Sequence, residues 1–190
     1  MNNENLAVIG IALVISLSGI IINLIKKGGN GKVKFIKDGS TLFWFRVLVP
    51  LALIVSLGFY FLKIGFVSLP SYSFYFGCFL VVFGLLIRWV SVRSLGNAFT
   101  VKVSILENHQ LKTDGIYTNI RHPSYTGLLV YYFGLGLVMQ NWICTVILII
   151  APLFAVINRI KMEEKVLLQN FSNEYNNYQE RSWRLFPYIY

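Results

Sequence analysis

Three stretches in the second half of the chain combine basic, acidic and phenolic side chains that could do chemistry. They cover residues 113–127, 159–164 and 171–187. Elsewhere the chain is dominated by apolar runs, so these stretches are where a binding or catalytic site can be built. A set of this kind can hold a charged ligand and orient a reacting group without a metal.

The first stretch has an Asp-Gly turn at 114–115 and then Arg121-His122-Pro123 directly before an apolar run. Pro123 suits the first turn of a helix, where its missing N–H costs nothing. Two interpretations remain open for this stretch. Arg121 and His122 either belong to a site or lie at the lipid headgroups, with the neighbouring tyrosines in the interfacial aromatic belt.

The second stretch reads Arg-Ile-Lys-Met-Glu-Glu over 159–164. Arg159 and Glu163 are four residues apart, so they share a face if the helix continues, either as a solvated ion pair or as two ligand-binding groups. In the third stretch Tyr175 and Tyr178 are three apart, as on one helix face, and Pro187 ends the pattern. Taken alone, this third stretch also fits an interfacial amphipathic helix.

The elements that position these residues are membrane helices. Of 190 residues, 56% are hydrophobic and 13% are charged, and the mean hydropathy is +0.62, which is wrong for a soluble domain. A span of the hydrocarbon core needs about 20 apolar residues. The apolar runs predict five helices, at about 6–25, 42–62, 72–92, 125–139 and 142–158. We therefore expect an all-α integral membrane protein.

Only Gln140 and Asn141 separate the last two runs, which predicts a tight helical hairpin over about 125–158. Basic residues gather on one side: six lie in 26–46, five in 88–121 and five in 159–184. By the positive-inside rule, the amino terminus is outside and the carboxy terminus is cytoplasmic. We divide the chain into three amino-terminal spans, 1–93, and a catalytic region, 94–190, with a cytoplasmic carboxy-terminal helix.

Several other classes of protein are disfavoured. The net charge of +9 comes from segments between apolar runs, which argues against nucleic acid binding. Cys78 and Cys144 lie within apolar runs without metal-ligand spacing, so neither a disulfide nor a metal site is predicted. The chain has no internal repeat and few ionisable groups within its spans, which leaves a transporter or a non-enzymatic membrane scaffold as the weaker alternative.

Order and spacing of the three stretches together resemble the isoprenylcysteine carboxyl methyltransferase family and its phospholipid methyltransferase relatives. The resemblance covers about residues 95–190. It is carried by His109, Thr113-Asp114-Gly115-Ile116-Tyr117, Arg121-His122-Pro123-Ser124-Tyr125 with Gly127, Arg159 with Glu163-Glu164, Phe171 with Tyr175 and Tyr178, and finally Arg181 and Pro187. The amino-terminal half resembles the family only in being made of membrane helices.

This resemblance implies an S-adenosylmethionine-dependent methyltransferase. It implies cofactor contacts by Lys102, His109, Gln110, Leu111, Lys112, Tyr117, His122, Pro123, Ser124, Tyr125 and Glu163. It also implies catalytic roles for Arg159, Glu164 and Arg181, with Arg159 on the substrate side. The chain departs from the family at Gln110 and Lys112, where a more apolar pair is expected, so backbone contacts are the implied role there.

The acceptor implied is lipophilic, either prenylcysteine-like or a lipid, because a site beside the bilayer admits a long tail laterally. A carboxylate acceptor, with a pKa near 3.5, needs no base at neutral pH, and Arg159 would orient it. Phospholipid amines or small thiols are the alternative acceptors, for which His122 or Glu164 would be the candidate base. The sequence does not choose between these acceptors.

Overall fold

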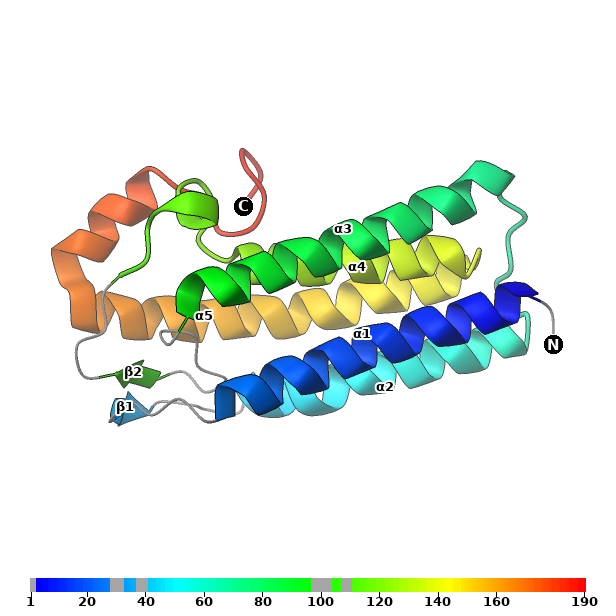
Figure 1. Cartoon of the computed structure of the whole chain (residues 1–190), viewed down its shortest axis with the longest axis horizontal. Helices are drawn as coiled ribbons and strands as arrows, with labels where there is room; N and C mark the ends of the chain where they lie inside the picture. Colours follow the sequence, from blue (N-terminus) through cyan, green and yellow to red (C-terminus); the bar gives the residue numbers. More distant parts are fainter. Residues whose placement is uncertain (1–2, 28–32, 37–40, 97–103, 107–110) are drawn as a thin grey trace.

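The computed structural model describes residues 3–27, 33–36, 41–96, 104–106 and 111–190. Five long helices run along one axis and form the body of the molecule (Figure 1). They are α1 (Asn3–Lys27), α2 (Thr41–Phe61), α3 (Ser71–Leu95), α4 (Pro123–Val138) and α5 (Trp142–Glu180). The five helices predicted from hydropathy are therefore present.

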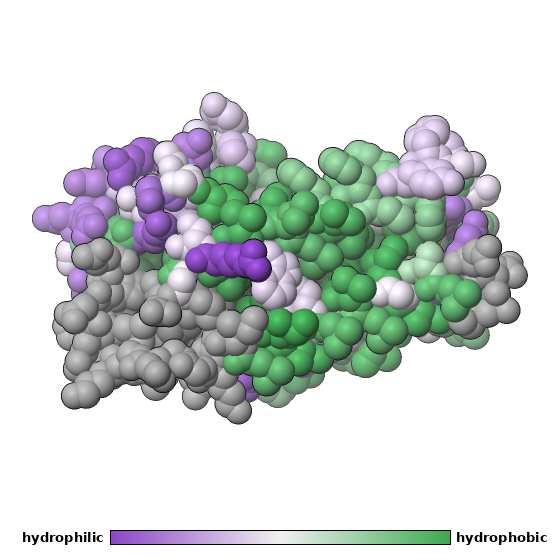
Figure 2. All heavy atoms as spheres, viewed as in Figure 1, coloured by the Kyte–Doolittle hydropathy of each residue, from purple (hydrophilic) through white to green (hydrophobic). Residues whose placement is uncertain are grey.

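Within the described residues, four helices are long and apolar enough to cross a membrane: α1, α2, α3 and α5. Helix α4 has 16 residues and is shorter than these. Apolar surface covers the middle of the bundle (Figure 2). Exposed apolar side chains include Leu13, Ile54 and Phe79, at 57%, 65% and 58% exposure. So much exposed apolar surface is stable only against lipid, which confirms the integral membrane fold.

Hydrophilic residues gather at one end of the bundle, hereafter the polar end, where α3 ends and α4 begins (Figure 2). The short 3₁₀ helix η2 (Gly115–Tyr117) and the last part of α5 lie there (Figure 1). Two strands, β1 (Val33–Ile36) and β2 (Ser104–Leu106), pair antiparallel at the same end. This small sheet was not predicted, because each strand is too short to show a sequence period.

The turn between α4 and α5 is as tight as predicted. Gln140 has a positive φ of 48°, and the Asn141 side chain accepts hydrogen bonds from the backbone N–H groups of Ile143 and Cys144 at 3.0 and 3.1 Å. Asn141 therefore caps α5. Its amide also donates to the Ile64 carbonyl at 2.8 Å, which ties the hairpin to the loop between α2 and α3.

Helix α5 extends well beyond the predicted end near residue 158, as far as Glu180. Residues 159–171 contain no glycine or proline, and their good helix formers continue the helix out of the apolar zone. The predicted separate cytoplasmic helix is thus the continuation of α5. A non-helical residue, Ser172 (φ 37°, ψ −109°), bends it so that the last part turns back over the polar end (Figure 1).

Candidate active site

Segments far apart in the sequence meet at the polar end and form a small parallel backbone pairing. The Arg121 N–H donates to the Trp183 carbonyl at 2.8 Å, and the His122 N–H donates to the Arg184 carbonyl at 3.0 Å. In return, the Trp183 N–H donates to the Asn119 carbonyl at 2.9 Å. The segment that enters α4 is thereby fixed to the segment that follows α5, and both lie over Glu163 and Glu164 of α5.

Glu163 accepts hydrogen bonds from two sides. The Tyr125 hydroxyl donates to its carboxylate at 2.6 Å, and Arg159 Nε donates at 2.9 Å from one turn earlier on α5. His122 Nδ1 lies 3.5 Å from its second oxygen. The Glu163 side chain keeps 23% of its surface exposed. It can therefore meet a positively charged group that approaches from outside the cluster.

Glu164, the next residue, is buried, with 5% of its side-chain surface exposed. Arg121 Nε donates to one oxygen at 2.9 Å and Arg184 Nε donates to the other at 2.8 Å. The guanidinium of Arg121 also donates to the Ser182 carbonyl and, at 3.3 Å, to the Gln179 carbonyl. Glu164 thus joins α5 to the entry of α4 and to the segment after α5.

His122 lies between the two glutamates. Its Nε2 is 3.5 Å from Glu164, matching the distance of Nδ1 from Glu163, and the residue is 7% exposed. Burial lowers the pKa of His122, but hydrogen bonding and charge from Glu163 and Glu164 outweigh it and raise the pKa above its ordinary value. The two carboxylates therefore favour the protonated imidazole, and the protonated form cannot act as a general base.

Tyrosines complete the inner wall of the cluster. The Tyr117 hydroxyl donates to the Ser91 carbonyl at 3.2 Å, and the Tyr178 hydroxyl donates to the Tyr117 carbonyl. The Tyr125 ring stacks on His122, with centroids 5.9 Å apart. Within the described residues, the Tyr175 hydroxyl is buried with no hydrogen-bond partner. Since buried hydroxyls are normally satisfied, this oxygen is suited to a polar ligand group.

The structure brings together Tyr117, His122, Tyr125, Glu163 and Glu164 of the predicted site residues, with Arg159 buried beside them. Arg159 also donates from Nη1 to the Thr41 hydroxyl of α2 at 3.3 Å. Arg181 has an exposed side chain directly after α5, and its backbone N–H donates to the Tyr178 carbonyl at 3.4 Å.

The remaining predicted residues lie around the edge or elsewhere. Pro123 and Ser124 are buried in the first turn of α4. Leu111 and Lys112 are half-buried, and Lys112 pairs with Asp114 at 2.8 Å. Lys102, His109 and Gln110 lie outside the described residues, so their roles remain predictions.

Sequence reasoning gave no site role to Arg88 or Arg184, and it left Arg121 open between a site and the lipid headgroups. Arg121 and Arg184 neutralise Glu164, and Arg88 of α3 donates to the Ser124 hydroxyl and carbonyl, both at 3.2 Å. The sequence could have indicated that Arg88 is paired, because an arginine inside an apolar run needs a polar partner. The partners of Arg121 and Arg184 are 43 and 20 residues away, so no local spacing indicates them.

Comparison with known proteins assigns the chain to a family. The sequence profile of the isoprenylcysteine carboxyl methyltransferase family matches residues 75–169, half of the 190 residues. A probable protein-S-isoprenylcysteine O-methyltransferase of Oryza sativa subsp. indica is 32% identical over 128 residues, covering 65% of this chain and 67% of the rice protein. The chain belongs to the isoprenylcysteine carboxyl methyltransferase family.

Further relatives agree with this family. The protein-S-isoprenylcysteine O-methyltransferase of Saccharomyces cerevisiae is 34% identical over 115 residues, covering 60% of this chain and 48% of the yeast protein. The solved structure of a eukaryotic intramembrane Ras methyltransferase of the family superposes with a TM-score of 0.65 at 24% identity. That match covers 74% of this chain and 52% of the solved chain. The chain thus spans about half the length of both proteins.

Membership of the family confirms the predicted fold class and the predicted methyltransferase. The profile match includes α4 and the Glu163-Glu164 pair, and it ends at residue 169. Tyr175, Tyr178 and Arg184 of the cluster lie beyond the matched range.

Proposed function

We propose that the chain transfers a methyl group from S-adenosylmethionine to the carboxylate of a lipophilic, prenylcysteine-like acceptor. The acceptor class is taken from the names of the relatives, which are protein-S-isoprenylcysteine O-methyltransferases. The observation that carries the proposal is the partly exposed Glu163 carboxylate, which is held by Tyr125 and Arg159. Glu163 offers a carboxylate to a cationic methyl donor, and the neighbouring His122 is not suited to act as a base.

The residues present fit the methyl donor. Glu163 is the reachable carboxylate, and the buried Tyr175 hydroxyl has no hydrogen-bond partner in the described part of the chain. Such atoms are stabilised when a ligand supplies the missing partner. The donor supplies a sulfonium-bound methyl that is already activated for transfer.

The protein must therefore align the acceptor with the donor's methyl group and exclude water. One carboxylate oxygen of the acceptor forms a bond to the methyl carbon as the carbon–sulfur bond breaks, giving a methyl ester and S-adenosylhomocysteine. No proton moves, because the acceptor is already ionised at neutral pH. Arg159 lies buried on α5, one turn before Glu163 and beside Thr41 at the start of α2, and it orients the acceptor carboxylate.

The geometry favours this acceptor over phospholipid amines and small thiols. Those nucleophiles must lose a proton, and the two base candidates are unsuited to accept it. His122 lies between two carboxylates that favour its protonated form, and Glu164 is buried between Arg121 and Arg184. A carboxylate acceptor needs neither residue as a base. The proposed roles of His122 and Glu164 are therefore structural and electrostatic.

The proposed orientation places the polar end in the cytoplasm. Nearly all lysines and arginines flank this end in the sequence, with Lys63 alone in a loop at the opposite end. The water-soluble donor reaches Glu163 from that side, while the acceptor's tail stays in the bilayer.

Product identification tests the proposal. The purified protein is incubated with methyl-labelled S-adenosylmethionine and, in turn, a farnesylcysteine, a phosphatidylethanolamine and a small thiol. We expect label on the farnesylcysteine alone, released as methanol by mild alkali because the product is a methyl ester. Alkali-stable label on the amine or thiol would contradict the proposed acceptor while leaving methyl transfer intact.

A further inference from the structure

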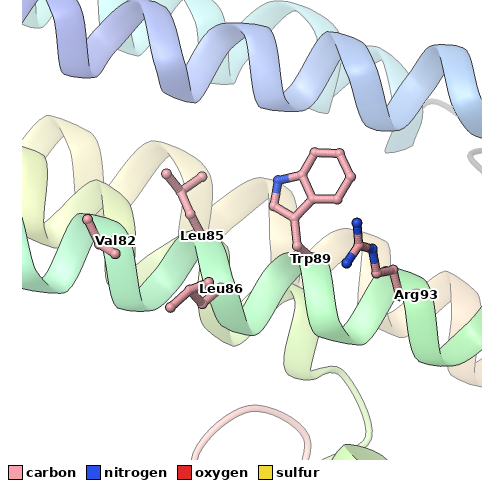
Figure 3. Close-up of a pocket in the computed structure, with 5 residues that line it drawn as sticks. All are labelled: Val82, Leu85, Leu86, Trp89 and Arg93. Atoms are coloured by element: carbon pink, nitrogen blue, oxygen red, sulfur yellow. The ribbon is translucent and has the colours of Figure 1, made fainter.

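A second feature lies away from the cluster, in a groove on α3 where it faces α1. Five residues of α3 line a cavity of about 320 Å³: Val82, Leu85, Leu86, Trp89 and Arg93 (Figure 3). This volume is at the lower end of the range for small-molecule sites. Trp89 and Arg93 point from α3 toward α1 in the same view. The groove does not include any residue of the candidate active site.

Trp89 connects α3 to α1 beside the groove. Its indole Nε1 donates to the hydroxyl of Ser18 on α1 at 2.9 Å, and Ser18 is buried. The indole therefore bridges the two helices at a set position along the groove. Beyond it, toward the middle of the bundle, the walls are aliphatic, and Val82 and Leu86 remain 58% and 57% exposed.

The side chains along one face of α3 change from aliphatic to aromatic to basic toward the polar end. Val82, Leu86, Trp89 and Arg93 follow at spacings of four, three and four, which places them on one helix face. Along the stripe an aliphatic part is followed by an indole and then by a guanidinium in the last turn of α3, at the polar end. A phospholipid has the same order: acyl chain, interfacial backbone and phosphate.

Arg93 supplies the charge that a phosphate needs. Its side chain is exposed, and it forms no ion pair with any acidic residue that the structure describes. Guanidinium groups bind phosphate through planar paired donors, and basic side chains at this depth attract anionic headgroups. Trp is also the residue that settles at the level of the headgroups.

We propose that this groove binds one glycerophospholipid of the surrounding leaflet, with an acyl chain along Val82, Leu85 and Leu86 and the phosphate on Arg93. The lipid is a bound structural ligand that fills the gap between α3 and α1. It is distinct from the methyl acceptor, and the proposal does not depend on the methyltransferase activity.

Native mass spectrometry of the full chain, titrated with phosphatidylglycerol, tests this site. Arg93→Gln removes the phosphate contact and should weaken binding about fivefold, the scale of one basic residue near a membrane surface. Val82→Trp fills the aliphatic part and should weaken it at least tenfold. The matched controls are Arg46→Gln, an exposed arginine of α2, and Phe83→Trp, the exposed neighbour on α3. Both should stay within twofold of wild type.

Three results would overturn the proposal. The first is that Arg93→Gln and Val82→Trp bind the lipid as the controls do. The second is displacement of the lipid by millimolar inorganic phosphate, which would reduce the site to an anion contact at Arg93. The third is competition by a farnesylcysteine, which would assign the groove to the acceptor. The proposal is supported if Arg93→Gln and Val82→Trp both weaken lipid binding and if the lipid stays bound in both competitions.

Discussion

At the scale of single residues, two adjacent glutamates have opposite environments. Glu163 is bound by Tyr125 and Arg159 and stays 23% exposed, whereas Glu164 is bound by two arginines and is 5% exposed. Neighbours on a helix point about 100° apart, so one carboxylate can face a ligand while the other holds the fold. We therefore assign ligand binding to Glu163 and structural support to Glu164.

Glu164→Gln is expected to destabilise the protein strongly. The amide cannot neutralise Arg121, whose side chain is 8% exposed, and a buried charge left unpaired costs about 3 to 5 kcal/mol. Thermal unfolding in detergent measures this as a lowered Tm. Glu174→Gln is the matched control, because Glu174 is an exposed glutamate of the same helix. A Glu164→Gln protein as stable as this control would contradict the structural role.

The raised pKa of His122 predicts a pH-dependent stability. The folded state binds a proton at a pH where the unfolded state has lost it, so the contribution of His122 is full below about pH 6.5 and is lost as pH rises through the raised folded-state pKa. The difference in Tm between wild type and His122→Gln should thus shrink as the pH rises above about 6.5. His109, the only other histidine of the chain, is present in both proteins and therefore does not contribute to the difference in Tm. A difference that grows with pH would contradict the environment described for His122.

The sequence predicted part of this cluster. The spacing of Arg159 and Glu163 predicted a shared helix face, and the 2.9 Å contact confirms it. The meeting of Glu163 with Tyr125 could not be predicted from spacing, since 38 residues and a tight hairpin separate them. Only the family resemblance brought these two residues together before the fold was known.

At the scale of elements, α3 and α4 approach each other through glycines spaced by seven residues. Gly84 lies against the Gly127 carbonyl and Gly77 against the Gly134 carbonyl, where an added Cβ would be 2.6 and 2.8 Å away. Small residues allow close backbone approach in membrane bundles. This contact sets the position of α4, and with it the position of His122 and Tyr125.

Gly84→Ala should therefore loosen the bundle. Its Cβ would meet backbone atoms of Gly127 and Tyr131 at 2.6 Å, and backbone cannot move aside as a flexible side chain can. We expect a loss of about 1 to 3 kcal/mol, the usual cost of overpacking, measured as a lowered Tm.

Gly58→Ala in α2 is the control for that change. An added Cβ there has nothing within 4 Å, so the higher helix propensity of alanine should leave the Tm unchanged or raise it slightly. If both variants behaved alike, the close α3–α4 contact would not support the fold as described.

Hydropathy was sufficient to predict the five long helices, because each buries its backbone polar groups within itself. The bend at Ser172 was not predicted, since serine is not a helix breaker and nothing in the local sequence indicates its φ of 37°. Tyr175 and Tyr178, both buried, lie just after this bend. The division of the chain at residues 93 and 94 remains a prediction.

At the scale of the whole molecule, the apolar belt, which is the exposed apolar surface around the helices, and the polar end have different roles. The polar end carries the charged cluster (Figure 2), and in the proposed function the belt keeps a lipophilic acceptor in the bilayer while the cluster faces a water-soluble donor. The cluster is built from α4, α5 and the segment after α5, so it exists only when the hairpin and the backbone pairing at Trp183 are formed. We therefore expect binding of the donor to stabilise the whole chain.

The central claim is that Glu163 holds the methyl donor, and calorimetry of S-adenosylmethionine binding to the detergent-purified protein tests it most directly. Wild type and the Glu174→Gln control should bind with matching affinity. Glu163→Gln should bind at least tenfold more weakly, because it loses the reachable carboxylate while Glu164 and its arginines keep the fold. A folded wild type that binds no S-adenosylmethionine, or a Glu163→Gln protein that binds it unchanged, would contradict the account.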